Sequence, residues 1–294
     1  MYLTGFADEA AEGIDDQIRA TRELGWRNIE MRRVNGKDLT ELSDAEFDAV
    51  AAKLEAAGVR VNCFGSRIAN WGKKIDEPFD SSLAEARQSI PRMRRLGTRL
   101  VRIMSFAVLE GRGPEDQMAD ERFRRLRELQ KMLTAAGITP VHENCMNYGG
   151  MGWRYTLELI ENVPGLKLVF DTGNPVFTDD RMKPPPYPKQ SAWEFYQQVK
   201  DHVAYVHIKD GVWETAEARA RFTFPGEGDG DVERIVRDLL DGGYDGGFSM
   251  EPHMSVVFHD DSVTSRAQAR YDNYIEYGHR FMKLLQRVGH PCAG

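Results

Sequence analysis

One pattern recurs along this sequence: a segment with helical spacing of apolar residues ends in glycine, and a short apolar run follows at once. The glycines are Gly25, Gly58, Gly97 and Gly137. The residue after a helix commonly adopts a left-handed backbone conformation, which glycine reaches without steric cost. Each of these glycines therefore predicts a helix end directly before a strand. Because alternating helices and strands require parallel strand pairing, the pattern excludes all-α and all-β architectures.

The apolar runs predict eight strands spread along the chain. They cover residues 3–6, 28–31, 59–64, 100–104, 138–142, 166–170, 203–208 and 248–250. Amphipathic helices are expected between them, and Ser43 with Glu46 has the form of a capping box at the start of one. Eight such units in 294 residues favour a closed (β/α)8 TIM barrel over an open doubly wound sheet.

The barrel is expected to occupy residues 1–294 as a single domain, because no composition break or low-complexity tract divides the chain. Residues 183–188 are rich in proline and are predicted to form a rigid loop beside the site. Residues 262–288 are predicted to form a long C-terminal helix. We expect this helix to pack on the barrel wall, with a contact between subunits as the alternative.

Composition narrows the class of protein. The formal net charge is −7 with both signs interspersed, which argues against a nucleic-acid partner. No run approaches the roughly 20 apolar residues of a membrane helix, and the N-terminus does not have the form of a signal peptide. Three scattered cysteines fit neither a disulfide framework nor a zinc ribbon and are typical of a reducing compartment. We therefore expect a cytoplasmic protein that does not bind membranes.

The last four predicted strands each end in a carboxylate or an imidazole. These residues are Glu143, Asp171, His207 and Glu251. Because the active site of a barrel is built at the C-terminal ends of its strands, the four side chains are expected to converge. Three carboxylates at one mouth would repel one another, and a divalent cation offsets that repulsion. Oxygen ligands with one nitrogen favour Mn2+, Co2+ or Mg2+, with Zn2+ as an alternative.

The sequence resembles the xylose isomerase-like TIM barrel superfamily of sugar isomerases, sugar epimerases and inosose dehydratases, whose distant relatives include apurinic endonucleases. The segments that carry the resemblance are His142-Glu143-Asn144, Phe170-Asp171-Thr172-Gly173-Asn174, His207-Ile208-Lys209-Asp210 and the glycine-rich residues 226–231. The resemblance implies one divalent ion, with Mn2+ expected first, held by the four residues named above. It also implies a small sugar or keto-sugar as substrate. We expect the protein to form a homo-oligomer.

The first functional hypothesis is a sugar isomerase or epimerase. A metal that binds two neighbouring oxygens of a keto-sugar polarises the carbonyl and acidifies the adjacent C–H. Glu143 and Glu251 are expected to face opposite sides of that carbon. One carboxylate removes the proton to give an ene-diolate, and the other returns a proton.

The alternative hypothesis is a lyase of the inosose dehydratase or 3-keto-C-glycoside deglycosidase type. In such a lyase, loss of the same proton expels a β-substituent, and no proton is returned to carbon. A second, smaller subunit would accompany the deglycosidase type. Asn174 and Trp213 stand where sugar epimerases commonly carry a histidine and an arginine, which argues against a direct assignment as a ketose 3-epimerase.

Two histidines bear on this choice. His142 precedes a predicted ligand, so strand alternation turns it away from the metal unless the strand end bulges. His253 lies two residues beyond Glu251 and is expected to share its side. An imidazole that reached the substrate would act as a general acid or base near neutral pH. His142 is therefore a candidate catalytic residue, and His253 is a candidate for substrate contact.

Further candidates for substrate contact lie near other strand ends. Glu30 and Arg102 are expected to bind hydroxyls or to form a buried ion pair, and Lys209 shares the side of His207. Glu227, in the glycine-rich turn, is expected to contact substrate or to orient a ligand histidine. The tryptophans that could stack on a sugar or an aglycone ring are Trp71, Trp153 and Trp213.

Overall fold

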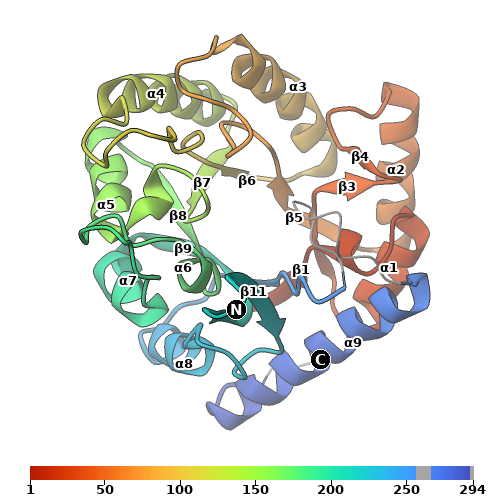
Figure 1. Cartoon of the computed structure of the whole chain (residues 1–294). Coiled ribbons are helices and arrows are strands. Elements are labelled where there is room, and N and C mark those ends of the chain that lie inside the picture. Colours follow the sequence, from red (N-terminus) through yellow and green to blue (C-terminus); the bar gives the residue numbers. More distant parts are fainter. Residues whose placement is uncertain (256–265, 292–294) are drawn as a thin grey trace.

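The computed structural model of the chain describes residues 1–255 and 266–291, and its centre is a barrel of eight parallel strands (Figure 1). The strands are β1 (Tyr2–Gly5), β2 (Asn28–Met31), β5 (Arg60–Gly65), β6 (Leu100–Ile103), β7 (Thr139–Glu143), β8 (Lys167–Asp171), β9 (Val203–Ile208) and β12 (Gly247–Met250). Their order is β1-β12-β9-β8-β7-β6-β5-β2. A parallel bridge between Phe6 and Glu30 joins the two ends of this order, so the barrel is nearly closed. The predicted (β/α)8 TIM barrel is confirmed.

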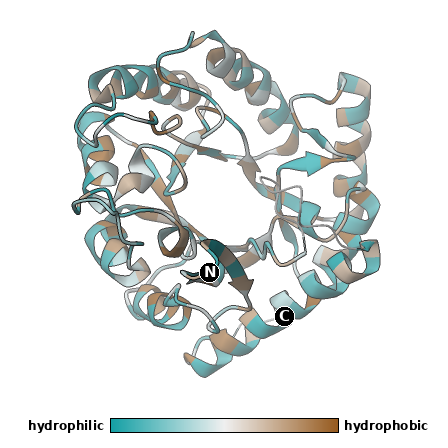
Figure 2. Cartoon of the chain, in the orientation of Figure 1, coloured by the Kyte–Doolittle hydropathy of each residue, from teal (hydrophilic) through white to brown (hydrophobic). Residues whose placement is uncertain are grey.

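Helices between the strands cover the outside of the barrel (Figure 1). The longer ones are α1 (Ile14–Glu23), α2 (Asp44–Ala57), α3 (Asp80–Leu96), α4 (Ala119–Ala135), α5 (Trp153–Asn162), α7 (Ala192–Val199), α8 (Val232–Asp241) and α9 (Ala267–Arg287). The short ones are α6 (Asn174–Phe177), η1 (Ala7–Glu9), η2 (Gly149–Met151) and η3 (Lys200–His202). Hydrophilic and hydrophobic residues alternate around the outer helices, as expected for helices with one buried face (Figure 2).

The local signals that predicted the helix boundaries are present in the structure. The backbones of Gly25, Gly58, Gly97 and Gly137 all have positive φ, between 66° and 78°. The capping box before α2 is formed in both directions between Ser43 and the third residue of the helix. Among the described residues, no helix is both long enough and apolar enough to cross a bilayer.

The C-terminal helix differs from its prediction at its start. Arg266 still has an extended backbone, and α9 begins at Ala267 instead of residue 262. Residues 262–265 lie outside the described residues. The sequence before Ala267 contains no proline or glycine to mark a boundary, so the pattern alone placed the start too early. Tyr277 and Phe281 of α9 are fully buried, so this helix packs on the barrel wall.

Side chains fill the barrel interior directly beneath the candidate site. Val141, Val169 and Tyr205 each precede a candidate metal ligand by two positions, so they share its face of the strand. Together with Cys63 they form a small buried cluster. The ligand candidates therefore stand on a packed floor inside the barrel and not over an open channel.

Two antiparallel hairpins extend from the barrel strands on the side of the site. The first pairs β3 (Arg33–Val34) with β4 (Lys37–Asp38), directly after β2. The second pairs β10 (Asp210–Glu214) with β11 (Arg219–Thr223), directly after β9. We call the second one the β10–β11 hairpin.

Asp210 anchors the base of the β10–β11 hairpin. Its carboxylate is buried and accepts four backbone N–H groups, at 2.8 Å from Gly211, 2.8 Å from Gly226, 3.1 Å from Gly228 and 2.9 Å from Gly230. Glycine is required at two of these positions, because an added Cβ would lie 2.4 Å (Gly228) or 2.8 Å (Gly230) from an oxygen of the same carboxylate. One side chain therefore fixes both the hairpin and the glycine-rich loop.

Asp210→Asn is expected to lower the free energy of unfolding by about 2–4 kcal/mol. The amide nitrogen would face two N–H donors and leave them without an acceptor, at about 1–3 kcal/mol each. Urea denaturation followed by circular dichroism measures the change. Asp229→Asn, at an exposed position in the same loop, is the control and should leave the free energy nearly unchanged. Equal stability of the two variants would contradict the anchoring role.

Candidate metal and substrate site

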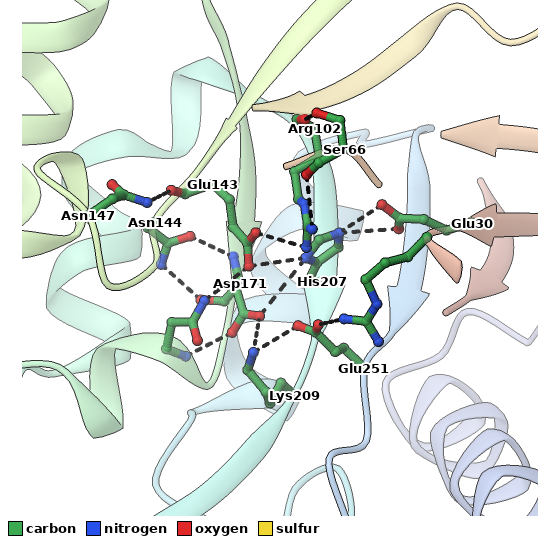
Figure 3. A network of polar contacts seen from close by, with 12 residues as sticks. Glu30, Ser66, Arg102, Glu143, Asn144, Asn147, Asp171, His207, Lys209 and Glu251 are labelled. Carbon is green, nitrogen blue, oxygen red and sulfur yellow. Dashed lines mark hydrogen bonds and ion pairs between the residues drawn. The ribbon is translucent and has the colours of Figure 1, made fainter. Parts of the chain in front are cut away.

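The four ligand candidates converge at the C-terminal ends of the strands. One ligand atom from each of Glu143, Asp171, His207 and Glu251 lies within 4.8 Å of those of the other three, and all four residues are buried. The strand register explains this convergence, because Asp171 on β8 and His207 on β9 are direct neighbours in the sheet. Figure 3 shows the four side chains pointing toward one another. Chain segments more than one hundred residues apart thus supply one cluster.

Several atoms of this cluster fit a metal ion. His207 Nδ1 is buried and makes no hydrogen bond. The buried Glu143 Oε2 and Asp171 Oδ2 form ion pairs with Arg102 at 3.2 Å and with Lys209 at 2.8 Å. His207 Nδ1 lies 3.6 Å from Glu143 Oε1 and 4.0 Å from Asp171 Oδ2, which is too far for a hydrogen bond. Buried polar atoms in folded proteins nearly always have a partner. An imidazole nitrogen left without a partner, beside two carboxylates, forms a donor set suited to a divalent cation.

The charge balance of the surrounding ion-pair network also favours a bound cation. Among the described residues, six buried carboxylates belong to this network: Asp8, Glu9, Glu30, Glu143, Asp171 and Glu251. Three cations face them, Arg32, Arg102 and Lys209, and the imidazoles of His207 and His253 contact Glu30 and Glu9. Protonation of His207 would offset only part of the excess negative charge. Because uncompensated buried charge is costly, a divalent ion would balance the network.

Neighbouring charges shift the pKa values within the cluster in opposite directions. Burial raises the pKa of Glu143, but Arg102 and His207 outweigh it and hold the pKa at about 2. Burial raises the pKa of Asp171 to about 6; Lys209 opposes this shift, and the two nearby glutamates add to it. Burial lowers the pKa of His207, but Glu30 and Glu143 outweigh it and raise the pKa to about 10. The electrostatic field at the centre of the ligand cluster therefore strongly favours a positive charge.

Asp171 is held in place by the two segments around it. Its Oδ1 accepts the backbone N–H groups of Gly173 (2.9 Å) and Asn174 (2.8 Å), which leaves Oδ2 directed into the cluster. The Asn144 side chain bonds both the backbone N–H and the carbonyl of Asp171, at 2.7 Å and 3.0 Å (Figure 3). The segments that follow β7 and β8 therefore fix each other.

Lys209 and Arg102, both predicted to contact substrate, line the pocket but are also paired with ligand candidates. Lys209 Nζ lies 2.8 Å from Asp171 Oδ2 and 2.8 Å from Glu251 Oε2. Arg102 Nη1 lies 3.2 Å from Glu143 Oε2. The two cations therefore position the carboxylates.

Glu30, which we expected to bind hydroxyls or to form a buried ion pair, does not line the pocket. It is buried and pairs with His207. Its two oxygens lie 3.3 Å and 3.2 Å from His207 Nε2, and the Tyr205 hydroxyl donates to one of them at 2.8 Å. A carboxylate on one nitrogen of a histidine orients the ring and directs the other nitrogen toward a metal. Glu30 thus has the orienting position that the sequence analysis gave to Glu227.

Glu227 itself lies elsewhere. Its Oε1 is 2.6 Å from Arg280 Nη1 of α9, at the surface, and it does not line the pocket. The structure therefore gives Glu227 no contact with the pocket or with a ligand histidine among the described residues. A glycine-rich turn brings backbone groups close to other elements. In this turn the backbone N–H groups of Gly226, Gly228 and Gly230 donate to Asp210, whereas the Glu227 carboxylate points to α9.

Glu30→Gln is expected to weaken Mn2+ binding by about 10- to 100-fold, the usual effect of removing a carboxylate behind a histidine ligand. The amide would no longer accept the ring N–H with a full negative charge, so His207 would be a poorer ligand. Isothermal titration with Mn2+ measures the affinity. Glu217→Gln, in the exposed turn of the β10–β11 hairpin, is the matched control. Unchanged affinity in Glu30→Gln would refute the orienting role.

His142 lies away from the pocket. The strand does not bulge at its end, and His142 Nε2 lies 3.0 Å from Ser105 Oγ, in a fully buried position that does not line the pocket. Burial lowers the pKa of His142 to about 4, so the ring is neutral near pH 7. The ring faces away from the pocket, as strand alternation leads one to expect, and the catalytic role of His142 stays a prediction.

His253 does line the pocket, and Glu9 holds it there. Glu9 Oε2 accepts the backbone N–H of His253 at 2.7 Å, and Glu9 Oε1 lies 2.9 Å from its Nδ1. The backbone of His253 has φ 53°, a left-handed conformation that is uncommon outside glycine. The opposite ring nitrogen, Nε2, lies 3.9 Å from Glu251 Oε1. Two buried contacts thus direct this imidazole toward the ligand cluster.

Sequence reasoning missed Arg32 and its partners. Arg32 directly follows β2, donates to Asp8 at 2.9 Å and 3.1 Å, and donates to Glu251 Oε1 at 2.9 Å. It also missed Asn174 as a neighbour of the cluster; Asn174 Nδ2 donates to Glu143 Oε1 at 3.2 Å. The position of Arg32 at a strand end could have marked it as a candidate for the site. Its pairing with Glu251, 219 positions away, has no signal in the sequence.

Two of the four ligand candidates, Glu143 and Glu251, line a pocket of about 410 Å³. Glu143, Glu251, Arg102 and Lys209 line its charged side, and loops after several strands line the rest. Small-molecule sites commonly have such a volume and combine a few convergent polar groups with apolar walls. The pocket therefore suits a small molecule bound against the ligand cluster.

Comparison with known proteins agrees with this architecture. The xylose isomerase-like TIM barrel family matches residues 18–283, so the chain belongs to that family. This confirms the resemblance inferred from the sequence. No curated protein sequence matches the chain significantly.

Solved structures show the same fold. A D-tagatose 3-epimerase-like protein aligns with a TM-score of 0.70 at 14% identity, covering 98% of both chains. A probable 3-DHS dehydratase involved in petrobactin synthesis from Bacillus anthracis aligns with a TM-score of 0.69 at 16% identity, covering 96% of this chain and 98% of that one. A xylose isomerase-like TIM barrel protein from Mycobacterium smegmatis in complex with magnesium aligns with a TM-score of 0.66 at 20% identity, covering 92% and 88%. Identities this low show the shared fold alone.

Proposed function

We propose that the protein is a divalent-metal-dependent sugar isomerase or epimerase that moves a proton next to a carbonyl. The observation that carries this proposal is the convergence of Glu143 and Glu251 on one ligand cluster from separated strands. Glu143 ends β7 and Glu251 follows β12, with β8 and β9 between them in the barrel. Carboxylates that approach from two directions can serve the two faces of one carbon. The fold shared with a D-tagatose 3-epimerase-like protein supports the same class.

The metal ion would be held by Glu143, Asp171, His207 and Glu251. When bound, it would polarise the substrate carbonyl and acidify the neighbouring C–H. Mixed oxygen and nitrogen ligands favour Mn2+, with Mg2+, Co2+ and Zn2+ as alternatives. The magnesium complex of the Mycobacterium smegmatis protein supports a hard divalent ion in this family.

The two carboxylates proposed to transfer protons, those of Glu143 and Glu251, are held by different neighbours. Arg102 and Asn174 contact Glu143, whereas Arg32 and Lys209 contact Glu251. Burial raises the pKa of Glu251, but Lys209, His253 and Arg32 outweigh it and hold the pKa well below its usual range. A carboxylate with a low pKa is a weak base, so the proton transfer depends on the position of the carboxylate oxygen and on acidification of the substrate.

Elimination from a keto-sugar is the second candidate, and the contact between Glu9 and His253 favours it. An elimination needs a proton donor for the leaving group in addition to the base. His253 lines the pocket, and Glu9 fixes its orientation through two contacts. The fold shared with the probable 3-DHS dehydratase supports this candidate.

Solvent exchange distinguishes the two reactions. The Mn2+-loaded protein would be incubated in D2O with ketoses, inososes and 3-keto-glycosides, and the products followed by NMR. Deuterium in a recovered isomer supports the isomerase or epimerase. A new enone or a released substituent supports the lyase. If none of these substrates exchanges or reacts, both candidates are refuted.

A further inference from the structure

We propose that the Arg32 guanidinium occupies a second cation position beside the ligand cluster and thereby limits the protein to one divalent ion. This position is surrounded by Glu9, Glu251 and His253, which we call the second group. Glu251 is also one of the four ligand candidates, so the ligand cluster and the second group share a carboxylate. The inference rests on the proposed function, because it takes the first ion to be held by the ligand cluster.

The second group has the composition of a metal site. One ligand atom from each of Glu9, Glu251 and His253 lies within 4.8 Å of those of the other two, and all three residues are buried. Two carboxylates and an imidazole are suitable ligands for a divalent ion. Three protein ligands are enough for a metal whose coordination is completed by water or substrate. The occupancy of the second group therefore depends on which cation lies among its members.

Arg32 supplies that cation. Its Nη1 lies 2.9 Å from Glu251 Oε1, and its Nη2 lies 3.3 Å from Glu9 Oε1. Its Nε and Nη2 also donate to the two oxygens of Asp8, at 2.9 Å and 3.1 Å. The guanidinium is always charged, and a bidentate pair with a carboxylate has a fixed geometry. A permanent positive charge this close to both carboxylates repels a divalent ion from the same position.

Packing also fixes the guanidinium. It lies over the Phe6 ring, 4.3 Å from the ring centroid, in a cation–π contact. Gly65 leaves room for this arrangement, because an added Cβ would lie 2.7 Å from Phe6 Cε1 and 3.2 Å from Arg32 Cβ. Because a displaced Arg32 would lose its contacts with three carboxylates and a ring, we expect the side chain to stay in place when metal is supplied.

The charge of the network agrees with one ion. Its six buried carboxylates face Arg32, Arg102 and Lys209, so three negative charges remain when the imidazoles are counted as neutral. One divalent ion offsets two of them, and a second ion would make the total positive. Without the charge of Arg32, four negative charges remain, and two divalent ions would offset all four. A neutral residue in place of Arg32 should therefore admit a second ion.

The number of ions bears on the chemistry of the site. A single ion suits the polarisation of a carbonyl, whereas paired ions stabilise the attacking and leaving oxygens of a displacement at phosphorus or at an acyl carbon. By excluding the second ion, Arg32 would keep the site to the first kind of chemistry. Arg32 is thus proposed as the residue that sets the metal content.

The experiment counts bound Mn2+ in variants of Arg32. Arg32→Met removes the charge and keeps much of the length of the side chain, whereas Arg32→Lys keeps the charge and is the matched control. Metal content is measured by mass spectrometry after unbound Mn2+ has been removed by gel filtration. The parent and Arg32→Lys are expected to hold about one ion per chain, and Arg32→Met about two. Adding Glu9→Gln to Arg32→Met removes a ligand of the second group and should return the content to about one.

Electron paramagnetic resonance gives a second measurement that does not depend on activity. Paired ions in a two-metal site lie roughly 3.5–4 Å apart. At such a separation the spins of two Mn2+ ions couple, so the signal per ion is expected to fall and broaden in Arg32→Met. The parent and Arg32→Lys should show the signal of an isolated ion.

Two ions in the parent, or equal metal contents in folded Arg32→Met and Arg32→Lys, would overturn the inference. So would a second ion that persists when Glu9→Gln is added. Arg32→Gln provides another neutral variant if Arg32→Met does not fold. A parent that binds no Mn2+ refutes the proposed metal site and the inference with it. If the parent and Arg32→Met each hold one ion, only the role of Arg32 is refuted. If the contents are as expected but no substrate exchanges or reacts, the inference stands and the proposed function fails.

Discussion

Asp171→Ala is expected to abolish stoichiometric binding of Mn2+, with a loss of affinity greater than about 100-fold. Residues behind metal ligands typically contribute 10- to 100-fold, and a direct ligand contributes more. Asp171 Oδ2 is buried and faces the ligand cluster and Lys209, and two backbone N–H groups on the other oxygen hold it in that orientation. An alanine offers no ligand atom at this position of the cluster.

Metal content after dialysis, measured by mass spectrometry, and titration with Mn2+ test this expectation. Asp229→Ala, in the exposed glycine-rich loop, is the control for the loss of one negative charge. The variant also frees Lys209 from one partner, so circular dichroism must show that the barrel remains folded. Full stoichiometric metal in a folded Asp171→Ala protein would refute the ligand set.

Much of the fold could be predicted because its signals are local. A helix-ending glycine and the strand after it are adjacent in sequence, and the same unit recurs, so each occurrence supports the others. The start of α9 was predicted too early because it depends on where the backbone turns, at Arg266, and no residue type marks that point.

The ligand candidates were predictable for a related reason. In a barrel the end of every strand faces the same side, so a residue at a strand end has a known location before the packing is known. Alternation along the strand separated Glu143 from His142 in the same way. Three local properties were sufficient to select the ligand candidates: the residue type, its place at the strand end and the face of the strand on which it lies.

The partners of these residues could not be predicted, because they depend on contacts across the barrel. Glu30 and His207 are 177 positions apart, and Glu9 and His253 are 244 positions apart. Nothing in either segment indicates which carboxylate reaches which histidine. Glu227 was chosen for its place in a glycine-rich turn, and a local signal of this kind says nothing about a long-range contact.

Glu251→Gln and Glu143→Gln are each expected to slow solvent deuterium exchange by at least about 100-fold, the usual scale for losing a general base. Glutamine keeps the shape of the side chain and one oxygen, so part of the metal affinity can remain while the proton affinity is lost. The exchange rate at saturating Mn2+ therefore separates the loss of a base from the loss of a ligand. Metal content is measured in the same samples.

His253→Ala is the competing variant, because this imidazole lies 3.9 Å from Glu251 and lines the same pocket. If the two glutamates carry the proton, His253→Ala retains exchange at the substrate carbon even where turnover falls. The opposite pattern has an equally clear meaning. If both glutamine variants exchange nearly as fast as the parent and His253→Ala is inactive, the glutamates are only ligands, the imidazole held by Glu9 moves the proton, and elimination becomes the leading function for this site.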